Sequence, residues 1–158
     1  MYDFDHFMID IFIACDHAAF ALKENILVHN NKEINFIDKG CYKDKSCDYP
    51  EYAFLVVEEI LKGNASIGVL LCNTGIGMSI SANRFQNIRA ALCFNSKMAV
   101  DARIHNDANV LCMGSSIVTF KDAIDIIKNF ANTRFLNEER HIRRIEKYNN
   151  LGGKPNVR

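Results

Sequence analysis

The chain has 158 residues, of which 49% are hydrophobic and 24% are charged, and its 19 Lys and Arg residues balance 19 Asp and Glu residues. This composition excludes an intrinsically disordered chain, and the zero net charge excludes the basic face with which proteins bind duplex nucleic acid. The length suits one domain. We therefore expect the partner to be a small molecule or another protein chain.

The sequence also indicates where the protein works. No apolar segment approaches the ~20 residues that span a bilayer, so we expect no membrane partner. Residues 1–8 mix acidic and apolar side chains and lack the basic region followed by an apolar one that marks a secretory signal. The six cysteines lack Cys-x-x-Cys and metal-finger spacing, which favours free thiols in a reducing cytoplasm over a disulfide framework.

Short apolar segments rich in Ile, Val and Phe alternate with segments of helical periodicity. In chain order, the pattern predicts strand 9–15, helix 18–30, strand 34–37, helix 52–61, strand 67–72, helix 76–84, strand 88–94, helix 96–104, strand 110–113, helix 121–130 and a last helix 134–148. Such alternation indicates an α/β fold, with an open parallel sheet between helices on both faces. We expect a single domain over 1–148, with 1–8 as an N-terminal extension and 149–158 as a polar, mobile tail.

A Gly-rich turn, 73–77, follows the third predicted strand. Ligands of parallel sheets bind beyond the carboxyl ends of the strands, and free N–H groups at the start of a helix hold an anion or a developing oxyanion. The turn is not a dinucleotide fingerprint, because Ile80 stands where the third glycine is needed, nor does it carry the Arg of a phosphatase loop or the Gly-Lys of a P-loop. A tight turn without a ligand is the alternative.

Two candidate acid–base groups follow strands at the same edge. Cys72 opens the turn, where the adjacent helix N-terminus would favour its thiolate as a base or nucleophile, unless it is only a buried strand cysteine. Asp16 and His17 follow the first strand and can exchange protons or bind sugar hydroxyls, unless they only cap the next helix.

Other candidates lie further away along the chain. His105 and Asn106 precede the last strand, so they lie at the opposite edge of the sheet unless a neighbouring subunit brings them to a site. Arg140 and Arg144 are four residues apart, which places them on one helix face, where two arginines can clamp a phosphate. A solvated helix face is the alternative for this pair.

Taken together, these residues resemble the sugar-phosphate isomerase family that contains ribose-5-phosphate isomerase type B and galactose-6-phosphate isomerase. The similar segments are CDHAAFALK (15–23), DYPEYA (48–53), LLCNTGIGMSISANR (70–84), IRAALC (88–93), HNDANVLCMGS (105–115) and RHIRRIE (140–146). The resemblance implies a Rossmann-like three-layer α/β/α sandwich with a five-stranded parallel sheet, in homodimers or homotetramers with shared active sites. It also implies interconversion of D-ribose 5-phosphate and D-ribulose 5-phosphate in the non-oxidative pentose phosphate pathway, without a metal or cofactor.

The resemblance further implies a role for each candidate. Cys72 would move a proton between C1 and C2 through an enediolate, Thr74 and Asp16 would exchange protons with the sugar oxygens, and His105 of a neighbouring subunit would open the ring. The substrate would be bound by His17, Tyr49, Asn73, Gly75, Ile76, Gly77, Asn106, Arg140 and Arg144, with His17 and the two arginines at the phosphate.

Two residues depart from the family pattern. Asn73 stands where the family usually has Gly, and Ser116 stands where many members have an Arg that adds to the phosphate site. These departures leave two alternatives: an isomerase of a six-carbon aldose phosphate, such as allose or galactose 6-phosphate, and a sugar-phosphate binding protein without catalysis.

Overall fold

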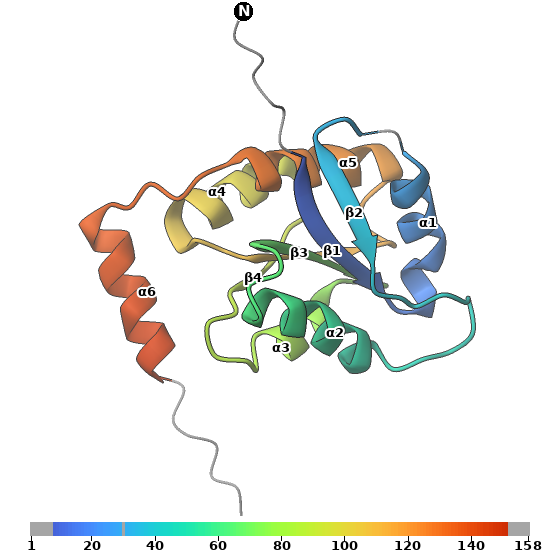
Figure 1. The fold of residues 1–158 in the computed structure, drawn as a ribbon, viewed down its shortest axis with the longest axis horizontal. Coiled ribbons are helices and arrows are strands. Elements are labelled where there is room, and N and C mark those ends of the chain that lie inside the picture. The colour runs from blue at the N-terminus through green and yellow to red at the C-terminus, as the bar shows by residue number, and fades with distance from the viewer. Residues whose placement is uncertain (1–7, 30, 152–158) are drawn as a thin grey trace, which may run out of the picture.

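The computed structural model describes residues 8–29 and 31–151. All strands of its five-stranded sheet are parallel, in the order β2-β1-β3-β5-β4 (Figure 1). They are β1 (Ile9–Cys15), β2 (Ile34–Asp38), β3 (Ile67–Cys72), β4 (Ala90–Leu92) and β5 (Val110–Gly114). The expected α/β fold with a five-stranded parallel sheet is confirmed.

Helices cover both faces of the sheet, so the molecule has three layers (Figure 1). One face carries α1 (Phe20–Val28), α4 (Ser96–Asn106) and α5 (Phe120–Asn132), and the other carries α2 (Tyr49–Leu61) and α3 (Ile76–Ala82). Strand β1 shows why: Ile11 and Ile13 pack in the core under α1 and α5, whereas Phe12 and Ala14 pack in the core under α2. Alternate residues of a strand point to opposite faces, so a strand covered on both sides is apolar throughout.

Local capping moves the starts of two helices from the predicted positions. Helix α2 begins at Tyr49 rather than at residue 52, because Asp48 is extended and Pro50 suits the first turn of a helix. A short 3-10 helix, η1 (His17–Ala19), precedes α1, because the Asp16 side chain accepts hydrogen bonds from the first amides of that turn.

The last helix, α6 (Glu139–Leu151), stands away from the sheet (Figure 1). It begins five residues later than the expected helix 134–148 and runs three residues into the segment expected to be a tail. The remaining tail residues, 152–158, and residues 1–7 of the expected extension lie outside the described residues. Among the helices that the structure describes, none is long and apolar enough to cross a membrane.

Strand β4, at one edge of the sheet, is much shorter than predicted. Strand β4 pairs only with β5 and over only three residues, Ala90 to Leu92, although the apolar segment runs from 88 to 94. Ile88 and Cys93 flank the ladder and are buried without belonging to it. Ala90 to Leu92 are only half-buried and Phe94 is 39% exposed, so the apolar segment overestimated both the burial and the pairing of this strand.

Candidate functional site

The loops that follow β1, β3 and β5 meet at the carboxyl edge of the sheet. These three strands are neighbours, with Cys15 opposite Leu71 and Cys72 opposite Gly114. The Asp16 amide donates a hydrogen bond to the Leu71 carbonyl at 3.1 Å, and the Ser115 amide donates to the Cys72 carbonyl at 2.9 Å. The chain thus gathers the residues around Asp16, Cys72 and Ser115 in one place, as expected for parallel α/β sheets.

Gly75 shapes the turn that leaves β3. Its φ is +78°, in the left-handed region, and an added Cβ would lie 2.5 Å from Leu92 Cδ1 and 2.8 Å from the Met113 carbonyl carbon. Only glycine meets both the conformation and this close approach to β5 without cost. Asn73 has no positive φ, so the departure from glycine there leaves the backbone of the turn unstrained.

Several amides of the turn have no partner. Among the described residues, the N–H groups of Asn73, Thr74 and Gly77 donate to nothing, whereas those of Gly75 and Ile76 donate to Cys72 Sγ and Thr74 Oγ1 at 3.1 and 3.3 Å. Unpaired amides at the start of a helix form a ready site for an anion or an oxyanion. The turn can therefore hold negative charge directly beside the Cys72 sulfur.

Cys72 differs in its surroundings from the cysteines buried nearby. Burial raises the pKa of the Cys93 thiol to about 12 and holds the pKa of Cys112 well above its ordinary value, with the neighbouring Cys72 and Cys93 adding to that shift. These two thiols stay protonated at neutral pH. Cys72 is only 4% exposed, but its sulfur accepts an N–H hydrogen bond and borders the turn.

Asp16 caps η1, which was the structural alternative for this residue, and one of its carboxylate oxygens still has no hydrogen-bond partner among the described residues. Its Oδ1 accepts from the Ala18 and Ala19 amides at 3.0 and 3.2 Å, while its Oδ2 makes no hydrogen bond with any described residue. The side chain is 6% exposed. Capping fixes one carboxylate oxygen and leaves the other for a ligand, so structural and chemical roles are compatible in this residue.

His17 and Tyr49 enclose the same edge. His17 is exposed, and its Nδ1 accepts a hydrogen bond from the Cys47 amide at 3.3 Å. The Tyr49 ring lies against Gly77: an added Cβ on that glycine would approach Tyr49 Cζ to 2.6 Å. Ile76, beside it, is 51% exposed. The structure thus brings these residues together with Asp16 and the turn.

The other predicted site residues lie elsewhere in the chain. Helix α4 ends with His105 and Asn106, and β5 starts just after and runs toward the Cys72 edge, so this pair lies at the amino edge of the sheet. Arg140 and Arg144 lie on α6, where the Arg140 Nε donates to Glu138 Oε2 at 2.7 Å. Within one chain these four residues do not join Cys72.

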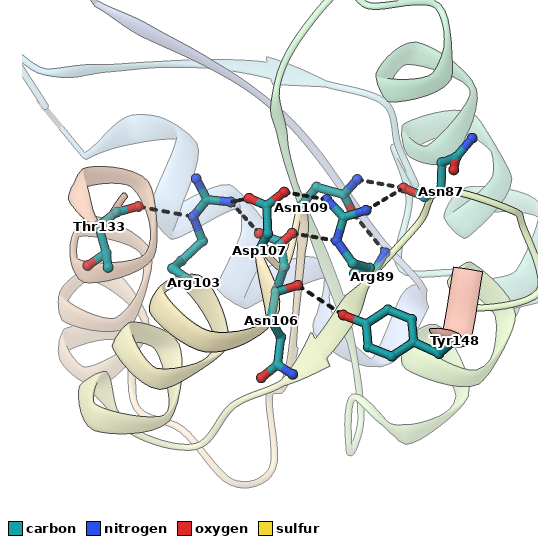
Figure 2. A network of polar contacts seen from close by, with 9 residues as sticks. Asn87, Arg89, Arg103, Asn106, Asp107, Asn109, Thr133 and Tyr148 are labelled. Carbon is teal, nitrogen blue, oxygen red and sulfur yellow. Dashed lines mark hydrogen bonds and ion pairs between the residues drawn. The ribbon is translucent and has the colours of Figure 1, made fainter. Parts of the chain in front are cut away.

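The end of α4 is held by a polar network that sequence analysis did not identify (Figure 2). Asp107 adopts a left-handed φ of 46° and ends the helix. Its carboxylate accepts from Arg89 Nη2 at 2.7 Å and from Arg103 Nη1 at 3.5 Å, and Arg89 Nε donates to its carbonyl at 2.7 Å. The hydroxyl of Tyr148, on α6, donates a hydrogen bond to the Asn106 carbonyl at 3.2 Å. The network fixes the segment that carries His105.

His105 also contacts α6. Its ring stacks on His141 with a centroid distance of 4.8 Å and an interplanar angle of 30°. Burial lowers the pKa of His141, and the nearby charges of Arg140, His105 and Arg144 lower it further, against the opposing effect of Glu138. The lowered pKa favours the neutral form of the His141 ring at pH 7.

A cavity of about 890 Å³ lies at this same amino edge. Its wall includes Asn83, Arg89, Asn106 and Tyr148 but not Cys72. This cavity is thus separate from the turn that follows β3. Among the described residues, no three His, Cys, Asp or Glu side chains are grouped so that they could hold a metal.

Ser115 and Ser116 follow β5, and the sequence suggested a connection with the site only for Ser116, at the position of a family arginine. Both donate to carbonyl groups of the other two loops: Ser115 Oγ to Ala18 at 3.0 Å and Ser116 Oγ to Asn73 at 2.7 Å. Their position beyond the carboxyl end of a central strand was the available signal, but their partners are distant in sequence.

Known proteins resemble this chain along most of its length. The family model described as Ribose/Galactose Isomerase matches residues 11–148. Ribose-5-phosphate isomerase B of Escherichia coli is 38% identical over 140 residues, which cover 88% of this chain and 93% of that protein.

Solved structures agree with the sequence comparison. A ribose 5-phosphate isomerase from Thermotoga maritima superposes with a TM-score of 0.85 at 46% identity, over 90% of this chain and 99% of that one. The type B ribose 5-phosphate isomerase of Leishmania infantum gives a TM-score of 0.87 at 41% identity, over 92% of this chain and 97% of that one. The chain therefore belongs to the ribose/galactose isomerase family.

Proposed function

We propose that this protein interconverts D-ribose 5-phosphate and D-ribulose 5-phosphate, the activity after which several of its relatives are named. The observation that carries this proposal is the Cys72 sulfur beside the unpaired amides of Asn73, Thr74 and Gly77, with the free Asp16 oxygen on the adjacent loop. An aldose–ketose isomerisation needs these parts: a base next to a carbon acid, an oxyanion site and a group that exchanges protons with hydroxyls.

In the proposed mechanism, the Cys72 thiolate takes the proton from C2 of the open-chain aldose. The electron pair of that C–H bond forms the C1=C2 bond of an enediolate, and the negative charge moves to O1, where the amides of the turn stabilise it. Thr74 and Asp16 move the hydroxyl proton from O2 to O1, and Cys72 returns its proton to C1 to give the ketose. No metal or cofactor enters this sequence of steps.

A second copy of the chain completes the site in this proposal. His105 and Asn106 lie at the amino edge of their own sheet, the stack on His141 and the Asp107 network hold them there, and α6 stands away from the sheet (Figure 1). This placement supports a homodimer or homotetramer in which His105 opens the sugar ring at the neighbour's Cys72. Arg140 and Arg144, together with His17, bind the phosphate.

We place the enzyme in the cytoplasm. All six cysteines are free thiols. Even Cys15 and Cys41, whose sulfur atoms lie 3.9 Å apart, do not form a disulfide. Unpaired thiols in such number support a reducing compartment.

The activity is tested by following conversion of ribose 5-phosphate to ribulose 5-phosphate with EDTA present. We expect turnover by the wild type and a loss of about 10²–10⁴-fold in kcat for Cys72→Ala, the range typical for loss of a positioned base. Cys93→Ala, a matched change at a buried cysteine outside the site, should keep kcat within about threefold. Absence of turnover in the wild type would overturn the activity, and retained turnover in Cys72→Ala would remove Cys72 from the role of base.

One observation favours a second substrate class. The Ser116 hydroxyl is engaged with the Asn73 carbonyl and carries no charge, so this position adds no cation to the phosphate site. A shorter, neutral side chain leaves room for a six-carbon aldose phosphate. Comparing kcat/KM for ribose 5-phosphate and allose 6-phosphate separates the two isomerase activities, and saturable binding of either sugar without turnover would indicate a binding protein.

A further inference from the structure

We infer that Ser115 and Ser116 are positioning residues, which hold the Asp16 loop and the Cys72 turn at a fixed separation. The inference deepens the proposed function and rests on it, because the two loops carry the base and the group that exchanges protons with the sugar oxygens. Neither serine is assigned to contact the substrate in the mechanism above.

Ser115 connects three loops by itself. Its amide donates to the Cys72 carbonyl at 2.9 Å, and its hydroxyl donates to the Ala18 carbonyl at 3.0 Å. Ala18 is in the capped turn whose amides fix Asp16 Oδ1. One residue therefore joins the peptide group of the proposed base to the turn that orients the Asp16 carboxylate.

Ser116 fixes the first peptide group of the turn. The Asn73 carbonyl accepts from both the Ser116 amide at 3.0 Å and the Ser116 hydroxyl at 2.7 Å. Two donors on one carbonyl restrain the orientation of the Asn73–Thr74 peptide plane, because each fixes the direction of one lone pair. The amide of that peptide group belongs to Thr74 and is one of the unpaired donors of the proposed oxyanion site.

Close packing transmits any movement of this segment. An added Cβ on Gly114, the residue before Ser115, would lie 2.5 Å from the Thr74 carbonyl carbon and 2.7 Å from its Cα. The loop after β5 therefore lies directly against the backbone of the turn. A shift of the serines changes the position of the oxyanion donors, and misplacement by about 1 Å can cost 10²-fold in rate.

The kinetic test uses Ser115→Ala, Ser116→Ala and the conservative Ser115→Thr, which retains the hydroxyl. We expect kcat to fall about 10-fold in each alanine variant while KM stays within about twofold, because lost alignment affects the reacting atoms more than substrate binding. Ser115→Thr should restore kcat to within about threefold of the wild type. The matched control is Ser66→Ala, an exposed serine at the amino end of β3, which should leave kcat and KM unchanged.

Hydrogen–deuterium exchange provides a readout that does not depend on activity. We expect Ser115→Ala to speed exchange about fivefold or more in peptides covering both 16–19 and 72–77, and Ser66→Ala to alter neither. Exchange that is unchanged in both segments, kcat unchanged in the alanine variants, or Ser115→Thr as impaired as Ser115→Ala would each overturn the inference. A wild type without turnover would overturn the proposed function, while the exchange data would still decide whether the serines couple the two loops.

Discussion

Gly75 is the residue at which the turn depends most on the absence of a side chain. Substitution Gly75→Ala adds a Cβ to a residue with φ of +78° and forces it toward Leu92 and the Met113 backbone. The conformation alone costs about 1–2 kcal/mol, and the clash adds to it. We expect urea unfolding to show a loss of about 3 kcal/mol or more, and kcat to fall as the oxyanion donors move.

Gly63 provides a matched control for this change. It has the same φ of +78°, but an added Cβ there would meet nothing within 4 Å. Gly63→Ala should therefore cost only about 1–2 kcal/mol and leave kcat unchanged. Equal losses of stability in the two variants would show that contact with β5 does not constrain the turn.

The sequence predicted where the candidate residues lie better than it predicted their hydrogen bonds. Asp16 follows β1 and Cys72 ends β3, and the rule that ligands bind at the carboxyl edge of a parallel sheet was enough to place them together. The free Asp16 Oδ2 and the Gly75 N–H bond to Cys72 Sγ depend on side-chain geometry that no spacing reveals. The roles of both residues remain predictions until the variants are measured.

At the scale of elements, a buried ion pair joins α1 to β2 behind the Asp16 loop. Lys23 Nζ binds both carboxylate oxygens of Asp38, at 2.7 and 2.6 Å, and the lysine side chain is fully buried while that of Asp38 is 24% exposed. Removal of one partner from a buried pair leaves an uncompensated charge, and this is most costly when the remaining charge is the more buried one.

Removal of the two partners should therefore have unequal effects. We expect Asp38→Asn to destabilise the protein by about 3 kcal/mol, because it leaves the Lys23 ammonium buried beside only the partly exposed Glu24 at 3.4 Å. Lys23→Met should cost less, since Asp38 can be reached by water. Urea unfolding of both variants measures the difference. A larger loss in the free energy of unfolding for Lys23→Met would contradict the conclusion that Lys23 is the more buried partner.

The ends of the helices are set by capping residues, which apolar periodicity does not reveal. The Pro50 first turn and the Asp16 cap moved the starts of α2 and α1. Helix α4 runs through His105 and Asn106, two residues beyond the predicted end, and stops where Asp107 adopts a left-handed conformation. Order and type of the elements were predictable, because burial on both faces makes strands apolar throughout and helices amphipathic. Cap residues decide where these helices start and stop, and apolar periodicity does not identify them.

At the scale of the whole molecule, the two groups of candidate residues lie at opposite edges of the sheet. Parallel strands require this separation: residues that precede β5, such as His105, are at one edge, and residues at the end of β3, such as Cys72, are at the other. The sequence already indicated that a neighbouring subunit is needed to unite them. The network around Asp107 and Tyr148 was not predictable, because it joins four separate segments of the chain (Figure 2).

The central claim is that each site takes Cys72 from one chain and His105 from another, and mixed variants test it most directly. Cys72→Ala and His105→Ala are each expected to be nearly inactive alone in ribose 5-phosphate turnover. When the two are co-refolded in equal amounts, half of the dimers are mixed and hold one intact site of two, so about a quarter of the wild-type rate should return. Full activity of His105→Ala alone, or no recovery in a mixture shown by mass spectrometry to contain mixed dimers, would contradict the shared site.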